Sequence, residues 1–228
     1  MYRYLLFDAD ETLFDFLRAE KTALNLAFGD CGIPFKEDYV PIYSEMNSKL
    51  WKRLERKEIT KPQLLAMRFA NFYEAMGFTG DPDLMRTAYQ KRLGEQCFLL
   101  PGAFDVIKKL SEDHRIYLIT NGLKTTQSNR LERSGLLPYL SGVFISEEVG
   151  YEKPDRKYFE KVKESIPGFK EEEALIIGDS LTSDILGGNN AGIKTVWFNP
   201  GGKVNNTKAE PYRIIKAIED IYAIVTSS

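Results

Sequence analysis

The chain contains few of the residues on which disulfide-stabilised proteins and zinc sites depend. Only two cysteines, Cys31 and Cys97, and one histidine, His114, occur among its 228 residues. The cysteines do not form a Cys-x-x-Cys pair, which argues against a disulfide scaffold or a zinc centre and favours reduced thiols. His114 follows a charged stretch, so chemistry that requires a histidine has a single weak candidate.

The sequence also lacks an excess of charge and a long apolar run. The 31 Lys and Arg residues nearly balance the 33 Asp and Glu residues, for a formal net charge of −2. This balance argues against polymeric nucleic acid as a partner, but not against a single nucleotide. No apolar run approaches membrane-spanning length, and three acids by Glu11 argue against a signal peptide. We therefore expect a cytoplasmic protein without a membrane partner.

Five short apolar runs predict the strands of a sheet. The runs are continuously apolar rather than alternating, as expected for parallel strands that are buried on both faces. A segment with helical spacing precedes each of the last four runs, and this alternation indicates a parallel, doubly wound α/β sheet. Isoleucines at 214–224 indicate a short edge strand followed by a last amphipathic helix. The five runs are Tyr4–Phe7, Ile116–Ile119, Val143–Ile145, Ala174–Ile177 and Thr195–Phe198, and the helical segments are 103–113, 125–134, 155–165 and 181–190.

Residues 17–98 interrupt this pattern with helices alone. Apolar residues recur there at helical spacing, and no stretch resembles a strand. Thr60 and Gln63 form a capping box, which marks the start of one of these helices. We therefore expect an α-helical domain inserted into a Rossmann-like core that comprises residues 1–16 and 99–228.

Polar side chains follow four of the predicted strands. The carboxyl ends of parallel strands meet at one edge of a sheet, where ligands bind near a topological switch point. Taken singly, an aspartate after a strand commonly caps a turn or a helix, and a loop lysine is commonly solvated. Their shared position favours one catalytic site instead. The residues are Asp8, Asp10, Thr120, Asn121, Gly122, Lys153, Asp179 and Asp184.

The order of these residues resembles the haloacid-dehalogenase-like hydrolase superfamily. Asp-x-Asp-x-Thr comes first, then a strand that ends in Thr-Asn-Gly, then Lys-Pro, and finally Gly-Asp-x-x-x-Ser-Asp. The resemblance covers the whole chain and implies that residues 17–98 are the superfamily's helical cap. The stretches DADETLF, LITNG, ISEEVG and GDSLTSDILGGNNAG further resemble a branch of house-cleaning pyrimidine nucleotidases.

The resemblance implies a nucleophile, an acid and a metal site. Asp8 would attack phosphorus and form an aspartyl-phosphate, and Asp10 would act as general acid and then as base. Mg²⁺ would bind to Asp8, to the backbone carbonyl of Asp10 and to Asp179. Asp184 would contact the metal through a water molecule, or it would contact the ligands without binding the metal itself.

The same resemblance implies a phosphate site. Thr120 and the amides of Asn121 and Gly122 would bind the phosphoryl oxygens. Lys153 would neutralise the net negative charge that remains when Asp8, the phosphate and the metal are summed.

Asp10 helps to choose among the reactions of the superfamily. Dehalogenases of this superfamily attack carbon and do not keep an aspartate at the second position, so Asp10 favours phosphoryl transfer to water. A helical cap implies a small substrate because it excludes bulky partners. The motif details imply a pyrimidine nucleoside monophosphate. Phosphoglycolate, a sugar phosphate, a phosphomutase reaction and a non-catalytic binding module remain alternatives, and the oligomeric state is left open.

Glu11 departs from the commonest form of the first motif, Asp-x-Asp-Gly-Thr. Glycine at that position eases a tight backbone. Either the turn accepts a side chain at position 11, or the loop differs locally from the family's usual shape.

Overall fold

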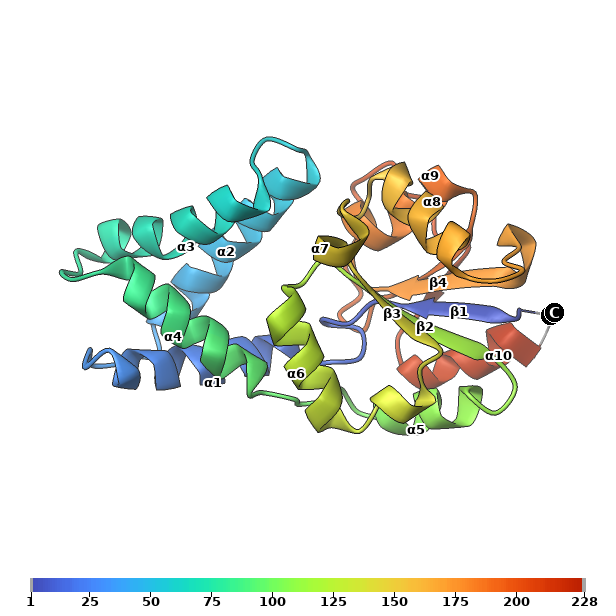
Figure 1. Cartoon of the computed structure of the whole chain (residues 1–228), viewed down its shortest axis with the longest axis horizontal. Coiled ribbons are helices and arrows are strands. Elements are labelled where there is room, and N and C mark those ends of the chain that lie inside the picture. The colour runs from blue at the N-terminus through green and yellow to red at the C-terminus, as the bar shows by residue number, and fades with distance from the viewer. Residues whose placement is uncertain (1, 227–228) are drawn as a thin grey trace. The chain divides into compact units, whose positions relative to one another are not determined.

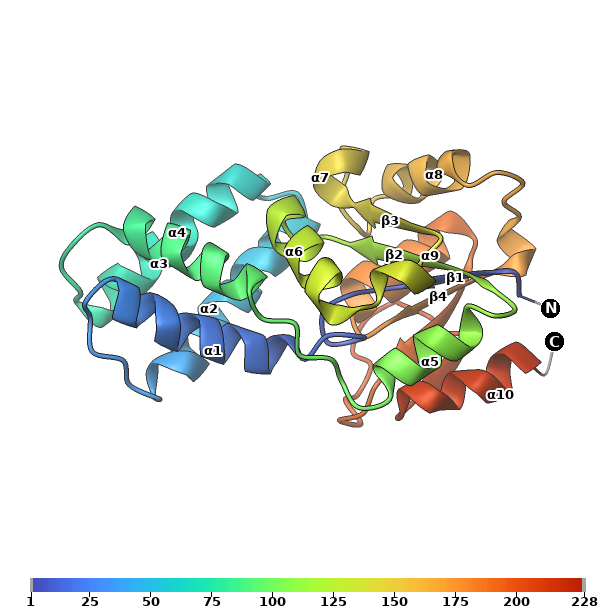
Figure 2. The same ribbon diagram turned by 60° about the horizontal axis from the view of Figure 1, so that its bottom comes forward.

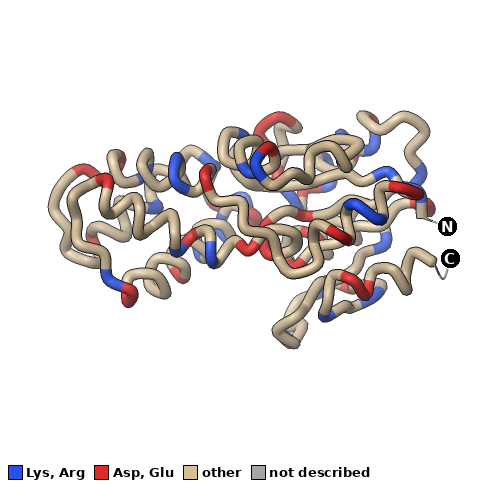
Figure 3. Tube along the Cα trace, turned by 90° about the horizontal axis from the view of Figure 1, so that it is seen from below, with Lys and Arg blue, Asp and Glu red and all other residues tan. Residues whose placement is uncertain are grey.

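A computed structural model of the protein describes residues 2–226, and the chain forms two compact units. One unit, the sheet unit, comprises Met1–Phe16 and Cys97–Ser228, and the other, the helical unit, comprises Leu17–Gln96. None of the helices within residues 2–226 is both long and apolar enough to cross a membrane. Basic and acidic residues are interspersed along the chain (Figure 3).

Within residues 2–226, the sheet unit is built on six parallel strands in the order β3-β2-β1-β4-β5-β6. Figure 1 labels the first four strands of this order. β1 is central, and its last residue, Phe7, pairs with Leu118 of β2 and Ile177 of β4. This arrangement confirms the predicted parallel α/β sheet. The strands are β1 (Tyr4–Phe7), β2 (Arg115–Thr120), β3 (Gly142–Ile145), β4 (Ala174–Gly178), β5 (Lys194–Phe198) and β6 (Arg213–Ile215).

Helices cover both faces of the sheet, which explains why its strands are apolar throughout. Leu5 and Phe7 of β1 pack with α5 (Ala103–Leu110), α6 (Lys124–Ser134) and α10 (Ile221–Thr226). The alternate residues, Tyr4 and Leu6, pack with α8 (Arg156–Ser165) and α9 (Leu186–Ala191) on the other face (Figures 1 and 2). The short α7 (Ser146–Val149) follows β3 directly.

The helical segment predicted at 181–190 does not begin as an α-helix. Leu181–Ile185 form a π-helical turn that continues into α9. The Ser180 hydroxyl caps this turn by accepting a hydrogen bond from the Ser183 N–H at 3.2 Å. Such π-helical turns are rare in proteins overall, and those that occur often lie at functional sites.

The helical unit contains α1 (Phe16–Asp30), α2 (Tyr39–Glu55), α3 (Lys61–Met76) and α4 (Pro82–Gly94), with the first residue of α1 in the sheet unit. Thr60 and Gln63 form the predicted capping box of α3, which ends at Gly77 in a left-handed conformation. Aromatic rings fill the interior: the centroid of the buried Phe72 ring lies 5.4 Å from that of Tyr43 and 6.3 Å from that of Phe28. The role of this unit as a cap stays a prediction.

Candidate active site

The first motif places Asp8 directly beyond the central strand. The Asp8 N–H donates to the carbonyl of Ile177 at 2.8 Å, which extends the β1–β4 pairing by one residue. The chain then turns, and the N–H groups of Leu13 and Phe14 both donate to the carbonyl of Ala9 at 2.9 Å. Since β1 fixes the backbone before Asp8 and the turn fixes it afterwards, the carboxyl group is held at the edge of the sheet.

Glu11 has the backbone conformation that favours glycine. Its φ is 58°, in the left-handed region. A side chain there costs roughly 1–2 kcal/mol. The Glu11 N–H donates to the carbonyl of Phe14 at 2.8 Å and closes the turn. The turn thus accepts a side chain at position 11, which is the first of the two possibilities that the sequence left open.

Lys153 connects two of the predicted carboxylates. Its Nζ donates to Oδ1 of Asp8 and to Oδ1 of Asp184, both at 2.6 Å, and to the carbonyl of Ile119 at 3.0 Å. The side chain is 1% exposed. Burial alone lowers the pKa of Lys153, but the charges of Asp184 and Asp8 outweigh burial and raise it. The group is therefore a buried ammonium with two anionic partners.

The Asn121 side chain holds the loop that carries this lysine. Its Nδ2 donates to the carbonyl of Lys153, and its Oδ1 accepts from the Lys153 N–H, both at 2.9 Å. This pair of hydrogen bonds joins the end of β2 to the segment that precedes α8. We predicted only the Asn121 backbone amide as a phosphate ligand, and the side-chain contact to Lys153 was not foreseen.

Three carboxylates gather where β1 and β4 end. Asp8, Asp179 and Asp184 each offer an oxygen, and these oxygens lie within 4.8 Å of one another. Asp184 is fully buried, and its Oδ2 accepts from the Ser180 N–H at 3.1 Å. Because Oδ1 of Asp184 is bound to Lys153, both of its oxygens already have protein partners. The Asp10 carboxylate is not part of this group.

The carboxylates strongly disfavour one another's charge. Burial and the charge of Asp184 raise the pKa of Asp8 to about 7, even though Lys153 acts in the opposite direction. Burial and the charges of Asp8 and Asp184 raise the pKa of Asp179 well above its usual range, and Glu11 contributes in the same sense. A divalent cation would offset this repulsion. Carboxylate and carbonyl oxygens are the ligands of hard cations, so the donor set fits Mg²⁺.

The second motif presents a hydroxyl at the end of β2. Thr120 is 1% exposed, and its Oγ1 accepts from the Gly122 N–H at 3.0 Å. Oγ1 also accepts from Nε2 of Gln127 at 3.1 Å. The hydroxyl thus comes from the end of β2, and Asp8 and Asp179 come from the ends of the neighbouring strands β1 and β4. Lys153 comes from the loop after α7, and Asp184 from the π-helical turn before α9.

Two residues of α6 that we did not predict contact Asp10. Nη1 of Arg130 donates to Oδ1 of Asp10, and Nε2 of Gln127 donates to Oδ2 at 2.7 Å. Gln127 is 1% exposed and Arg130 is fully buried. Their spacing of three residues places them on one helical face, but polar residues on such a face are ordinarily solvated. The sequence therefore offered little sign of their burial.

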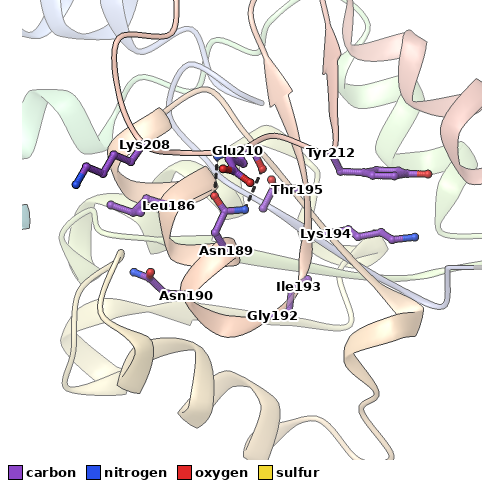
Figure 4. A pocket seen from close by; sticks show the side chains of 10 residues that line it. All are labelled: Leu186, Asn189, Asn190, Gly192, Ile193, Lys194, Thr195, Lys208, Glu210 and Tyr212. Atoms are coloured by element: carbon purple, nitrogen blue, oxygen red, sulfur yellow. Dashed lines mark hydrogen bonds between the residues drawn. The ribbon is translucent and has the colours of Figure 1, made fainter.

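A separate pocket lies on the sheet unit, between α9, β5 and the chain before β6. Its volume is about 540 Å³, and its lining includes Asn189, Lys194, Lys208, Glu210 and Tyr212 (Figure 4). The Asn189 side chain forms two hydrogen bonds with the backbone of Glu210, at 2.8 and 3.0 Å, which fixes one wall. None of the predicted site residues lines this pocket.

Comparisons with known proteins agree across both units. The family model of haloacid dehalogenase-like hydrolases matches residues 2–192. The pyrimidine 5'-nucleotidase PynA of Streptococcus pneumoniae is 42% identical over 96% of this chain and 93% of its own. The pyrimidine 5'-nucleotidase YjjG of Escherichia coli is 37% identical over 86% of this chain and 85% of its own.

A solved structure is also similar over nearly the whole length. The HAD-hydrolase YfnB of Bacillus subtilis, crystallised with bound magnesium, is 41% identical to this chain. The two structures superpose with a TM-score of 0.94, and the match covers 98% of each chain. The shared fold therefore includes the inserted helical unit.

Proposed function

Because the chain belongs to the haloacid dehalogenase-like hydrolase family, we propose that it is a Mg²⁺-dependent phosphatase that hydrolyses pyrimidine nucleoside 5'-monophosphates. The observation that carries the reaction class is the contact of Lys153 with Asp8 and Asp184 beside Asp179. The proposed substrate is supported by the similarity to PynA and YjjG.

The proposed reaction has two steps at Asp8. A carboxylate oxygen of Asp8 attacks phosphorus, the bond to the 5' oxygen breaks, and an aspartyl-phosphate forms. Asp10 gives a proton to the departing alkoxide and later takes one from the water that attacks phosphorus. Hydrolysis releases inorganic phosphate and restores both carboxyl groups.

Other residues would balance charge and hold the phosphoryl group. Lys153 offsets the negative charge beside Asp8, and the Thr120 hydroxyl with the amides of Asn121 and Gly122 would bind phosphoryl oxygens. Mg²⁺, held by Asp8, Asp179 and the Asp10 carbonyl with Asp184 behind them, would supply positive charge to the phosphate when bound.

The proposal extends to the helical unit and to the location of the enzyme. The helical unit, predicted at 17–98, would be the cap that restricts the reaction to small phosphorylated substrates. A cytoplasmic enzyme agrees with the free thiols of Cys31 and Cys97, because reducing compartments keep cysteines unpaired.

A substrate panel tests the proposed function. We expect kcat/KM for UMP, dUMP and dTMP to exceed that for AMP, GMP, phosphoglycolate and ribose 5-phosphate by at least about 10-fold. Release of inorganic phosphate is measured with Mg²⁺ and again with excess EDTA, which should abolish turnover. Turnover of sugar phosphates without pyrimidine nucleotides would contradict the proposed substrate only. No release from any ester would contradict the proposed reaction.

Asp179 offers a test of the metal site. Asp179→Asn removes one charge from the carboxylate cluster and should raise the Mg²⁺ concentration for half-maximal activity by at least about 10-fold. Mg²⁺ should also raise the melting temperature of the wild type more than that of the variant, because the cation binds the folded state. The exposed Asp113, which precedes β2, supplies the control Asp113→Asn. Equal Mg²⁺ dependence in the wild type and Asp179→Asn would exclude Asp179 as a ligand.

A further inference from the structure

We propose that Gln127 and Arg130 are positioning residues that fix the orientation of Asp10 and of the Thr120 hydroxyl for phosphoryl transfer. The inference rests on the proposed function, because it assigns the two residues to the same reaction. Both residues lie on α6, the helix that follows the Thr-Asn-Gly motif (Figure 2).

Arg130 is a buried cation whose place is set by Asp10. Its side chain is fully buried, whereas that of Asp10 is 29% exposed. The guanidinium carbon lies 4.4 Å from the centroid of the Phe14 ring, and Nη1 donates to Oδ1 of Asp10. Burying a guanidinium is costly unless it is paired and hydrogen-bonded. The ion pair with Asp10 offsets the cost of burying Arg130, and the same contact holds the proposed acid in one orientation.

Gln127 supplies the second hydrogen-bond donor from α6 to the Asp10 carboxylate. Its Oε1 accepts from Nη1 of Arg130 at 3.3 Å, and its Nε2 donates to Oδ2 of Asp10 at 2.7 Å. The amide cannot be reversed without turning its oxygen toward the carboxylate, so the network itself settles its orientation. Both oxygens of Asp10 thus receive donors from one helix, and rotation of the carboxyl group is restricted.

The same amide also determines what the Thr120 hydroxyl can do. Oγ1 accepts from Nε2 of Gln127 and from the Gly122 N–H. A hydroxyl oxygen has two acceptor positions and one proton. Both acceptor positions are used here, so the hydroxyl can only donate, and a phosphoryl oxygen is an acceptor. Among residues 2–226, no acceptor takes that proton.

A double-mutant cycle with two kinds of substrate tests the proposal. The variants are Arg130→Met, Gln127→Met and Asp10→Asn, each alone, and the first two each combined with Asp10→Asn. The substrates are UMP, whose alkoxide leaving group needs a proton, and p-nitrophenyl phosphate, whose phenolate does not. The exposed Arg133, three residues further along α6, supplies the control Arg133→Met.

Arg130→Met should lower kcat for UMP by about 10²-fold, and the loss for p-nitrophenyl phosphate should be much smaller. In the Asp10→Asn background the same substitution should cost almost nothing more in kcat, because Arg130 acts through Asp10. Gln127→Met should in addition raise KM for both esters by about 5-fold, because Thr120 loses one donor. Arg133→Met should leave both rates unchanged.

Each of the following outcomes overturns the inference. Additive losses in the double variants, or equal losses on both esters, would mean that the α6 residues act through general packing. If Arg130→Met does not fold, Arg130→Lys and Gln127→Met test the inference instead. Near-wild-type kcat for UMP in both of these variants would contradict it. A wild type that hydrolyses neither UMP nor any other alkyl phosphate would refute the proposed function and the inference together. A wild type that hydrolyses them, with additive variants, would refute the inference alone.

Discussion

Asp8→Asn is expected to lower kcat by at least about 10³-fold, because an amide cannot replace the carboxylate as nucleophile. Asp8 stands beyond the central strand, with Oδ1 2.6 Å from Nζ of Lys153. An asparagine keeps the shape of the side chain and can still accept from that ammonium. The loss should therefore be in the chemical step and not in substrate binding.

The pKa of Asp8 predicts that this variant folds well. Burial and Asp184 raise that pKa from 3.8 to about 7, so the ionised carboxylate opposes folding. For an acid whose pKa is raised by folding, stability falls as the pH rises from the unfolded value to the folded value. In EDTA, the wild type should lose stability between about pH 4 and 7 through this group. Asp8→Asn lacks that loss, and at pH 7.5 its melting temperature should equal or exceed that of the wild type.

Three measurements check this expectation together. Phosphate release gives kcat, thermal unfolding in EDTA across the pH range gives stability, and Asp113→Asn serves as the control for an exposed carboxylate. Near-normal turnover by Asp8→Asn would contradict the covalent mechanism. A lower melting temperature at pH 7.5 would show that the ion pair with Lys153 outweighs burial.

After Asp8→Asn, we expect the largest effect from Lys153→Met, which should lower both kcat and the free energy of unfolding. The lysine is the cation shared by Asp8 and Asp184, and all three side chains are buried or nearly so. Its removal leaves two carboxylates facing each other, which typically costs about 3–5 kcal/mol of unfolding free energy. We expect kcat to fall by at least about 10²-fold, because the charge that stabilises the transferring phosphoryl group is lost.

Mg²⁺ separates the two consequences of this substitution. The cation should recover part of the lost stability, because it can neutralise the same carboxylates, but it should not restore kcat. Unfolding by denaturant with Mg²⁺ and with EDTA measures the first, and phosphate release measures the second. Lys161→Met, at an exposed position on α8, is the matched control. A Lys153→Met variant with wild-type kcat would show that the ammonium has no role in the reaction.

The fold could be predicted from local patterns in the sequence. Strands that are buried on both faces must be apolar throughout, and helices on both sides of the sheet require apolar residues at helical spacing. β1 is a continuous four-residue apolar run, and α3 begins at the predicted capping box. These signals are carried by neighbouring residues, so one sequence suffices to find them. The positions of the motifs then predicted which strands are followed by polar residues.

The contacts within the site depend on residues that are far apart in the chain. Asp8 and Lys153 are 145 positions apart, and Asp10 and Arg130 are 120 positions apart. In the sequence Arg130 and Gln127 look like the solvated face of a charged helix, and Asn121 looks like one more phosphate ligand. Whether a polar side chain is solvated or buried against a partner is decided by the packing of α6 and the β2 loop against the sheet.

The sequence by itself determined the parallel sheet and the inserted helices, and it predicted a set of acids, a hydroxyl and a lysine at one sheet edge. Only the tertiary structure decided which of these groups pair: Lys153 with Asp8 and Asp184, Asn121 with the Lys153 backbone, and α6 with Asp10. It also showed that Glu11 adopts the left-handed turn that glycine usually occupies. The reason is physical: secondary structure follows from local periodicity, whereas the partner of a buried charge depends on which distant groups the fold brings within hydrogen-bonding distance.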